Sequence, residues 1–259
     1  MTADRTNNTN SFSLSCSILI VGSLLWNEDK AGIRAEWRDD RLDLAAATRI
    51  HVPLRYGRRS QGWGNTFTMV LDAMAPSGKA LLVPCKASVH SYADLLEEIR
   101  LLWSAEDSSP PIDRFYKSWG CVAALFGPKA AAVGFPEQWR ATFQAAKPPQ
   151  LRVVDQDGLL SIPWPRRFDG EMVTGQDIIL ATATMPRPLD ERPSPQDIAE
   201  AWIGQEEGHE RYFLENVRHG IRTGDDAEIW SAVEHANPLW LQNGWYADVV
   251  DTLRREKAY

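Results

Sequence analysis

The stretch Ser17–Trp26 reads S-I-L-I-V-G-S-L-L-W, a short apolar strand that runs into a Gly-Ser turn and ends on a tryptophan. Gly22 can adopt backbone angles closed to other residues, so the chain can turn sharply there and leave successive N–H groups pointing at an oxyanion or a carboxylate. A turn of this kind is a candidate cradle for a carboxylate or an oxyanion. Taken alone the pattern is not specific, because Gly-Ser after a strand is more often an ordinary turn.

The composition predicts a soluble globular protein with one large domain, or a domain with an appended lobe, because its 259 residues are 44% hydrophobic and 24% charged. The formal net charge of −7, without a basic stripe, argues against a nucleic-acid partner. The apolar run Leu14–Leu25 is shorter than the roughly 18 residues that a membrane span needs, so no membrane partner is expected.

The three cysteines, Cys16, Cys85 and Cys121, are odd in number and lie in apolar surroundings. This usage favours free thiols in a reducing compartment over a disulfide framework, so we expect a cytoplasmic protein. A thiol nucleophile is one interpretation of each cysteine, and a small buried side chain is the commoner one. Residues 1–16 begin with a polar segment and are expected to form a disordered tail.

Successive β-rich segments with turns between them predict an antiparallel meander, curled into a small barrel. The expected strands are Arg49–Tyr56, Thr66–Asp72, Lys79–Cys85, Trp119–Phe126 and Asp177–Met185, with two short strands within Leu151–Ile162 around Asp157-Gly158. The expected helices are Phe135–Ala146, Pro195–Trp202, Glu210–Gly220 and Asp225–Val233, with helical composition over Pro238–Tyr259. The charged run Asn27–Leu44 predicts a loop and a poorly defined amphipathic segment.

The clearest helix signal follows Ser91, which stands as N-cap with Asp94 three residues on. The apolar residues then recur at the spacing of one buried stripe that includes Ile99. Glu106 lies seven positions beyond Ile99 and returns within about 20° of it on the apolar face, whereas Glu97 and Glu98 point the other way. An acid at the end of a buried face is a candidate for a raised pKa and for proton transfer. Helix geometry alone favours the alternative, a frayed end with Glu106 in water.

The sequence lacks the motifs of the common metal, serine-nucleophile and nucleotide-binding sites. None of the five histidines stands in a metal-ligand pattern such as H-E-x-x-H, so no metal site is expected. Ser23 is not in a G-x-S-x-G nucleophile elbow, and Gly57–Gly64 has neither dinucleotide nor P-loop spacing. No cofactor is therefore expected.

Four features in order resemble the gamma-glutamylcyclotransferase-like family, including its glutathione-specific branch. They are V-G-S-L-L-W at Val21–Trp26, P-L-R-Y-G-R-R-S at Pro53–Ser60 followed by T-F-T-M-V-L-D, L-W-S-A-E at Leu102–Glu106, and S-P-Q-D-I-A-E-A-W-I-G at Ser194–Gly204 followed by Y-F-L-E-N-V. The resemblance covers the stretch from about Ile18 to Trp230.

The resemblance implies an α+β fold, a mixed β-barrel surrounded by helices, over residues 17–185 with an inserted lobe at 115–162. Residues 186–259 would be C-terminal helices packed on the same domain. It also implies cleavage of a γ-glutamyl amine or peptide, in which the substrate's own α-amine attacks the γ-carbonyl and 5-oxoproline is released. Glu106 would be the acid/base, and the N–H groups of Gly22, Ser23 and Leu24 would bind a carboxylate or the oxyanion. Arg55, Arg58 or Arg59 would pair with a second carboxylate, although surface arginine is the commoner role.

Three features depart from the family pattern: Val21 replaces its tyrosine before Gly-Ser, and the segments between Trp26 and Arg49 and over Phe115–Ile162 have no counterpart. They motivate an alternative, a non-catalytic protein of the same fold that senses or carries a small acidic metabolite. A third hypothesis, an interaction scaffold, has only the 11 tryptophans in its favour, and these more often fill cores.

Overall fold

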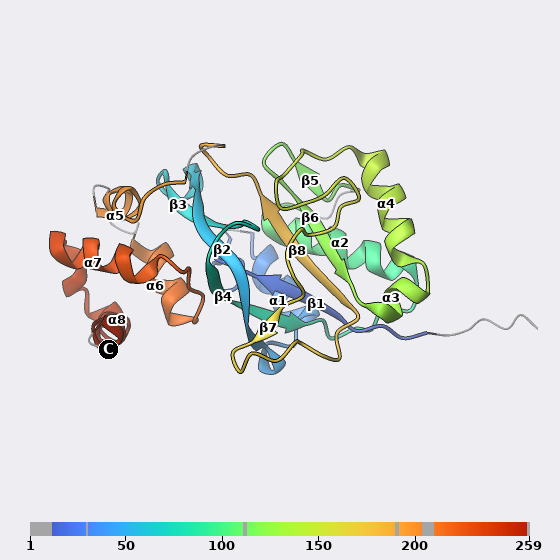
Figure 1. Ribbon diagram of the computed structural model, residues 1–259, viewed down its shortest axis with the longest axis horizontal. Helices are drawn as coiled ribbons and strands as arrows, with labels where there is room; N and C mark the ends of the chain where they lie inside the picture. The colour runs from blue at the N-terminus through green and yellow to red at the C-terminus, as the bar shows by residue number, and fades with distance from the viewer. Residues whose placement is uncertain (1–11, 30, 111–112, 190–191, 204–209, 258–259) are drawn as a thin grey trace, which may run out of the picture.

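A computed structural model describes residues 12–29, 31–110, 113–189, 192–203 and 210–257 as a mixed α+β structure built on an eight-stranded sheet (Figure 1). The strands are β1 (Cys16–Ile20), β2 (Thr48–Ser60), β3 (Thr66–Leu71), β4 (Ser77–Pro84), β5 (Tyr116–Lys117), β6 (Gly120–Phe126), β7 (Arg166–Arg167) and β8 (Ile178–Thr184). The helices are α1 (Ile33–Arg41), α2 (Tyr92–Asp107), α3 (Pro128–Ala132), α4 (Phe135–Ala146), α5 (Pro195–Ile203), α6 (Glu210–Arg218), α7 (Asp226–Ala236) and α8 (Ala247–Lys257). Short 3-10 turns occupy Leu44–Ala46, Gln61–Trp63, Leu239–Gln242 and Gly244–Tyr246.

Strand β1 lies at the centre of the sheet, whose order is β3-β2-β4-β1-β8-β6-β5, with β7 paired to β2. It runs antiparallel to β4 and parallel to β8, and all five of its residues are buried. A strand covered on both faces is apolar at every position rather than at alternate ones, which explains the continuous run S-I-L-I. The central position of β1 places the Gly-Ser turn that follows it in the interior.

The expected closed barrel is wrong. Within the described residues β3 and β5 form opposite edges of the sheet and do not pair, so the sheet is open. The reason is the crossover to β8, which pairs between β1 and β6 and extends the sheet beyond the β2–β4 meander. The sheet nevertheless bends enough for β3 to contact β8.

Segment 115–162, expected as an inserted lobe, is continuous with the sheet. Strand β6 pairs with β8 from Gly120↔Thr184 to Phe126↔Ile178, and α4 packs Trp139 and Phe143 into the core. The two short strands expected in Leu151–Ile162 are absent from this described segment, which makes single bridges instead. Asp155 explains the difference, because its carboxylate accepts the N–H groups of Asp157 and Leu159 and folds the segment into a turn.

The charged run Asn27–Leu44, expected as a loop and a poorly defined amphipathic segment, contains helix α1 over Ile33–Arg41. One further expectation is corrected. Glu98, expected to point away from the apolar face, is 3% exposed and forms an ion pair with Arg41 of α1. Residues 1–11 of the expected tail lie outside the described residues, but Leu14 and Cys16 at its end are buried.

The C-terminal helices α5–α8 lie beside β2 and β3, on the side of the sheet away from α2–α4 (Figure 1). Trp202 of α5 stacks on Phe213 of α6, which stacks on Trp230 of α7, and Trp202 also meets Tyr56 of β2 edge-on. Residues 204–209, between the expected helices Pro195–Trp202 and Glu210–Gly220, lie outside the described residues. No helix in the described ranges has the length and apolar character needed to cross a membrane.

Candidate active site

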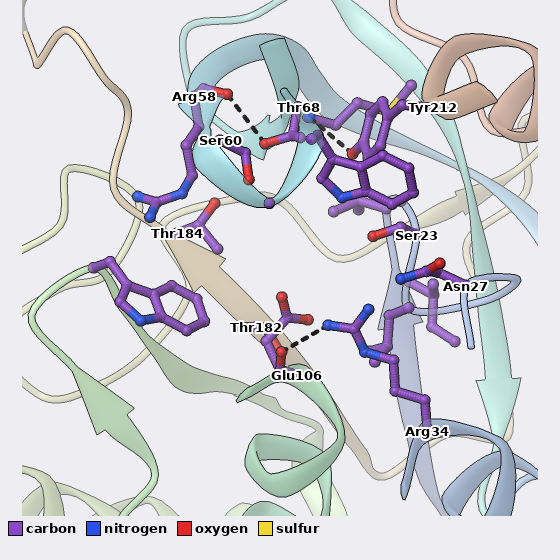
Figure 2. Close-up of a pocket in the computed structure, with 18 of the residues that line it drawn as sticks. Ser23, Asn27, Arg34, Arg58, Ser60, Thr68, Glu106, Thr182, Thr184 and Tyr212 are labelled. Carbon is purple, nitrogen blue, oxygen red and sulfur yellow. Dashed lines mark hydrogen bonds between the residues drawn. The ribbon is translucent and has the colours of Figure 1, made fainter. Parts of the chain in front are cut away.

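A cavity of about 510 Å³ opens where the bent sheet brings β3 and β8 together. The loop after β1, the C-terminal end of α2 and the start of α6 complete its wall (Figure 2). Its polar lining residues are Ser23, Asn27, Arg34, Arg58, Ser60, Thr68, Glu106, Thr182, Thr184, Arg211 and Tyr212. Of the residues expected to form a site, Gly22, Ser23, Leu24, Arg58 and Glu106 line this one cavity.

The loop after β1 has free donors. The N–H groups in the second half of the loop form hydrogen bonds within its turns: Leu25 N–H donates to Gly22 O at 3.2 Å, and Asn27 N–H donates to Ser23 O at 2.8 Å. The N–H groups of Gly22, Ser23 and Leu24 donate to no acceptor within the described part of the chain. Three successive unpaired donors at a cavity wall suit an anionic oxygen.

Glu106 is the last but one residue of α2, which continues to Asp107, so the frayed alternative does not apply. The side chain is half-buried, and its carboxylate is directed into the cavity (Figure 2). Burial raises the pKa of Glu106, the Arg34 and Arg58 cations oppose this effect, and Asp107 adds to it. The net pKa is raised, which suits a group that both accepts and returns a proton.

Arg34 of α1 stands beside Glu106 and was not identified from the sequence. Its Nε and Nη2 donate to the carbonyl oxygens of Ala105 and Glu106 at 2.8 and 2.9 Å. These carbonyls belong to the last turn of α2 and have no partner within that helix. The sequence signal that could have found it is the spacing of Arg34, Arg38 and Arg41 at i, i+4 and i+7 in the segment expected to be a loop and a poorly defined amphipathic segment.

Arg58 and Arg55 differ in position although both belong to β2. Arg58 lines the cavity, where its Nη1 donates to Met185 O at 3.0 Å and its guanidinium lies 5.3 Å from the Trp119 ring centroid. Arg55 is not among the described cavity residues; it is buried, and its Nε donates to Asp72 at 2.5 Å. A β-bulge lies between Tyr56 and Arg58, in the stretch of β2 that joins the two arginines.

The third arginine considered for carboxylate binding, Arg59, also lies outside the cavity lining among the described residues. Its guanidinium covers the Phe67 ring at 4.4 Å and donates to Asn65 O at 3.1 Å. Of the three β2 arginines considered for carboxylate binding, Arg55, Arg58 and Arg59, the geometry therefore leaves Arg58 to meet a ligand in the cavity.

Tyr212 of α6 places a hydroxyl against the Gly-Ser turn that follows Val21. A Cβ on Gly22 would lie 2.7 Å from that hydroxyl oxygen, so only glycine fits there. The hydroxyl accepts the N–H of Met69 at 3.0 Å, and burial raises the pKa of Tyr212. The phenol therefore stays protonated at neutral pH, with its own proton available to a ligand.

Aromatic rings support this wall of the cavity. Trp63 and Tyr212 meet edge-on with centroids 5.3 Å apart, and Trp26 packs against both. Trp26 is fixed by its Nε1, which donates to Asn216 at 2.9 Å, and the Arg211 guanidinium lies 5.6 Å from its ring. On the opposite wall Thr182 Oγ1 is buried without a hydrogen-bond partner in the described residues.

No group of three or more His, Cys, Asp or Glu side chains within the described ranges is placed to hold a metal ion. The arrangement therefore offers one carboxyl group, three free amides, hydroxyls and arginines as its chemical groups.

Comparison with protein-family models, with curated proteins and with solved structures gave no match for this chain.

Proposed function

We propose that the protein is a gamma-glutamylcyclotransferase that cleaves a γ-glutamyl amine or peptide to 5-oxoproline and the free amine. One observation carries the proposal: the Glu106 carboxylate and the free N–H groups of Gly22–Leu24, about 80 positions apart in the chain, line the same cavity. A proton acceptor and an oxyanion cradle on one cavity are the two elements that intramolecular acyl transfer needs.

The reaction needs no enzyme nucleophile. The substrate's α-amine attacks its own γ-carbonyl, a C–N bond forms, and the Glu106 carboxylate accepts a proton from that amine. The resulting oxyanion is held by the amides of Gly22–Leu24. The bond from the former carbonyl carbon to the leaving nitrogen then breaks, and Glu106 returns the proton to this nitrogen. The products are 5-oxoproline and a neutral amine.

The arginines favour a substrate whose leaving half is acidic. Figure 2 shows Arg58 and Ser23 on opposite sides of the cavity, so a γ-glutamyl group held at the Gly-Ser turn would direct its leaving half toward Arg58. A guanidinium pairs well with a carboxylate, and Trp119 beside it offers an apolar surface. A γ-glutamyl amino acid or small peptide meets these requirements.

Mass spectrometry of γ-glutamyl compounds incubated with the protein tests the proposal. The wild type is expected to release 5-oxoproline with an equal amount of amine. Glu106→Gln is expected to lower the rate by about 10²- to 10⁴-fold, the usual contribution of a general acid/base. Glu97→Gln is the matched control, because Glu97 is an exposed carboxylate on the same helix and is expected to retain the wild-type rate. Release at the wild-type rate by Glu106→Gln would exclude the proton-transfer role.

Binding without turnover is the second candidate, favoured by Val21 on the cavity wall in place of the family tyrosine. In that case the protein would sense or carry a small acidic metabolite. Calorimetry would then detect binding of a γ-glutamyl compound that is recovered unchanged after long incubation. Stoichiometric appearance of 5-oxoproline would exclude this candidate.

A further inference from the structure

Helix α1 carries three arginines on one stripe. Arg34, Arg38 and Arg41 are spaced by four and three residues, so at about 100° per residue they fall within about 60° of one another. The helix start is fixed by Asp29, whose carboxylate accepts the N–H of Ile33 at 2.9 Å and of Arg34 at 3.1 Å. The stripe is therefore held at a defined orientation.

Arg38 binds the loop that follows β1. It is 7% exposed, and its Nη1 donates to the carbonyl oxygens of Leu24 and Asn27, each at 3.0 Å. These carbonyls flank the turn that comes directly after the free amides of Gly22–Leu24. Arg38 is not among the described residues that line the cavity, so it acts on a ligand only through this loop.

The other two arginines bind α2. Arg34 donates to the carbonyl oxygens of Ala105 and Glu106 in the last turn, and Arg41 forms an ion pair with Glu98 about two turns earlier. Two attachment points along one helix fix its position and its rotation relative to α1. The direction of the Glu106 side chain depends on both.

We propose that α1 is a bracket that fixes the Glu106 carboxylate relative to the amides of Gly22–Leu24, with Arg38 and Arg34 as positioning residues. Its catalytic consequence rests on the proposed function, because it concerns the distance between the proton acceptor and the oxyanion cradle. Misplacement of reacting groups by about 1 Å can cost on the order of 100-fold in rate. The segment between Trp26 and Arg49, which has no counterpart in the resembled family, would thus be part of the active site.

Hydrogen exchange measured by mass spectrometry tests the bracket without any substrate. The amides of Leu25 and Asn27 are hydrogen-bonded inside the loop that Arg38 holds. Arg38→Met removes two charge-assisted hydrogen bonds and is expected to speed their exchange by at least about 10-fold. Asp40→Asn, an exposed change on the same helix, is expected to leave it unchanged.

Steady-state kinetics on a γ-glutamyl compound from which the wild type releases 5-oxoproline give the catalytic readout. Arg38→Met is expected to lower kcat by about 10- to 100-fold. Arg38→Lys keeps the charge and one hydrogen bond. It is expected to give values between those of the wild type and Arg38→Met in both measurements. This variant keeps the test decisive if the methionine variant does not fold.

The pH profile of kcat/KM isolates Arg34. Glu106 faces Arg34 from α1, Arg58 from β2, Asp107 on its own helix and the neutral phenol of Tyr212 from α6. Arg34→Met is expected to move the acidic limb of the profile to higher pH, because it removes one of the two cations that lower the pKa of Glu106. Arg34→Lys keeps a cation and is expected to restore the wild-type limb.

Wild-type exchange at Leu25 and Asn27 in a folded Arg38 variant would overturn the bracket, and so would wild-type kcat in that variant. Absence of 5-oxoproline from every γ-glutamyl compound with the wild type would instead remove the proposed function. In that case the exchange rates alone would decide whether α1 holds the loop.

Discussion

Burial and two guanidinium groups act on the Glu106 carboxyl in opposite directions. Burial dominates and raises its pKa, while Arg34 and Arg58 limit the rise by stabilising the carboxylate. Because the two cations only partly compensate for burial, the ionised Glu106 lowers the stability of the folded protein. Residues that serve a function often lower stability in this way.

This cost is measurable as a dependence on pH. Because the pKa of Glu106 is raised on folding, the folded state binds more protons than the unfolded state between the two pKa values, and its stability falls as pH rises through that window. Glu106→Gln removes this loss. We expect the difference in Tm between the variant and the wild type to increase in favour of the variant from about pH 4.5 to pH 7.5.

Thermal unfolding at several pH values checks this expectation. Asp226 and Glu98 also have raised pKa values owing to burial, but both proteins contain them and their effect cancels in the difference. A Tm difference that stays constant over the range would show that Glu106 has the same pKa in the folded and unfolded chains.

Arg55 and Arg58 are expected to affect different properties. Arg55→Met leaves Asp72 without its partner and is expected to lower the free energy of unfolding by about 1–3 kcal/mol, with little change in KM. Arg58→Met is expected to raise KM for an acidic substrate by about 10- to 100-fold, the effect of one charge-assisted hydrogen bond. Denaturant unfolding and kinetics on both variants separate the two roles, and a KM effect confined to Arg55→Met would reverse their assignment.

At the scale of elements, the helix α2 and its cap could be predicted from the sequence, whereas α1 could not. Ser91 accepts the N–H of Asp94 at 3.2 Å, and Leu95, Ile99 and Leu102 are fully buried, as the periodicity predicted. Helix α1 lacks such a pattern, because its buried residues are Trp37 and Arg38. An arginine that satisfies backbone carbonyls is indistinguishable in sequence from one on a solvated face.

Strand β4 is joined to the C-terminal helices through a close backbone contact. Lys79 and Arg222 exchange N–H···O bonds of 2.7 and 2.9 Å, and a Cβ on the neighbouring Gly78 would lie 2.6 Å from Arg222 O. Gly78→Ala must therefore displace this contact. We expect a loss of about 1–3 kcal/mol and a fall in Tm of roughly 2–10 °C.

Gly244→Ala is the matched control for Gly78→Ala, because no atom lies within 4 Å of the added methyl group and Gly244 is exposed. It is expected to unfold at the wild-type temperature. Equal Tm values for the two variants would mean that the contact between β4 and Arg222 is loose.

At the scale of the whole molecule, distant parts of the chain build one cavity. The β1 loop, α1, β2, the end of α2, β8 and α6 each contribute a lining residue. The local character of most strands could be predicted from alternation and turn residues, whereas the α+β class was implied by the family resemblance. The open sheet could not, because pairing of β8 with both β1 and β6 depends on which distant strands meet rather than on any local pattern.

The candidate site could be predicted in part for the same reason. The phase of Glu106 on α2 and the turn at Gly22 are local properties, and both line the cavity. The choice of Arg58 over Arg55 depends on which side chain reaches the cavity, and the roles of Arg34 and Tyr212 depend on how α1 and α6 pack. These features depend on tertiary packing, which cannot be predicted from local patterns in a single sequence.

Intramolecular attack by the substrate amine distinguishes this chemistry from hydrolysis, and a reaction in water enriched in oxygen-18 separates the two. Mass spectrometry of the product formed from a γ-glutamyl amino acid is expected to find 5-oxoproline without the heavy isotope, because no water oxygen enters when the amine closes the ring. Glutamate carrying oxygen-18 in its γ-carboxylate would show that water is the nucleophile and would contradict the proposed cyclotransferase.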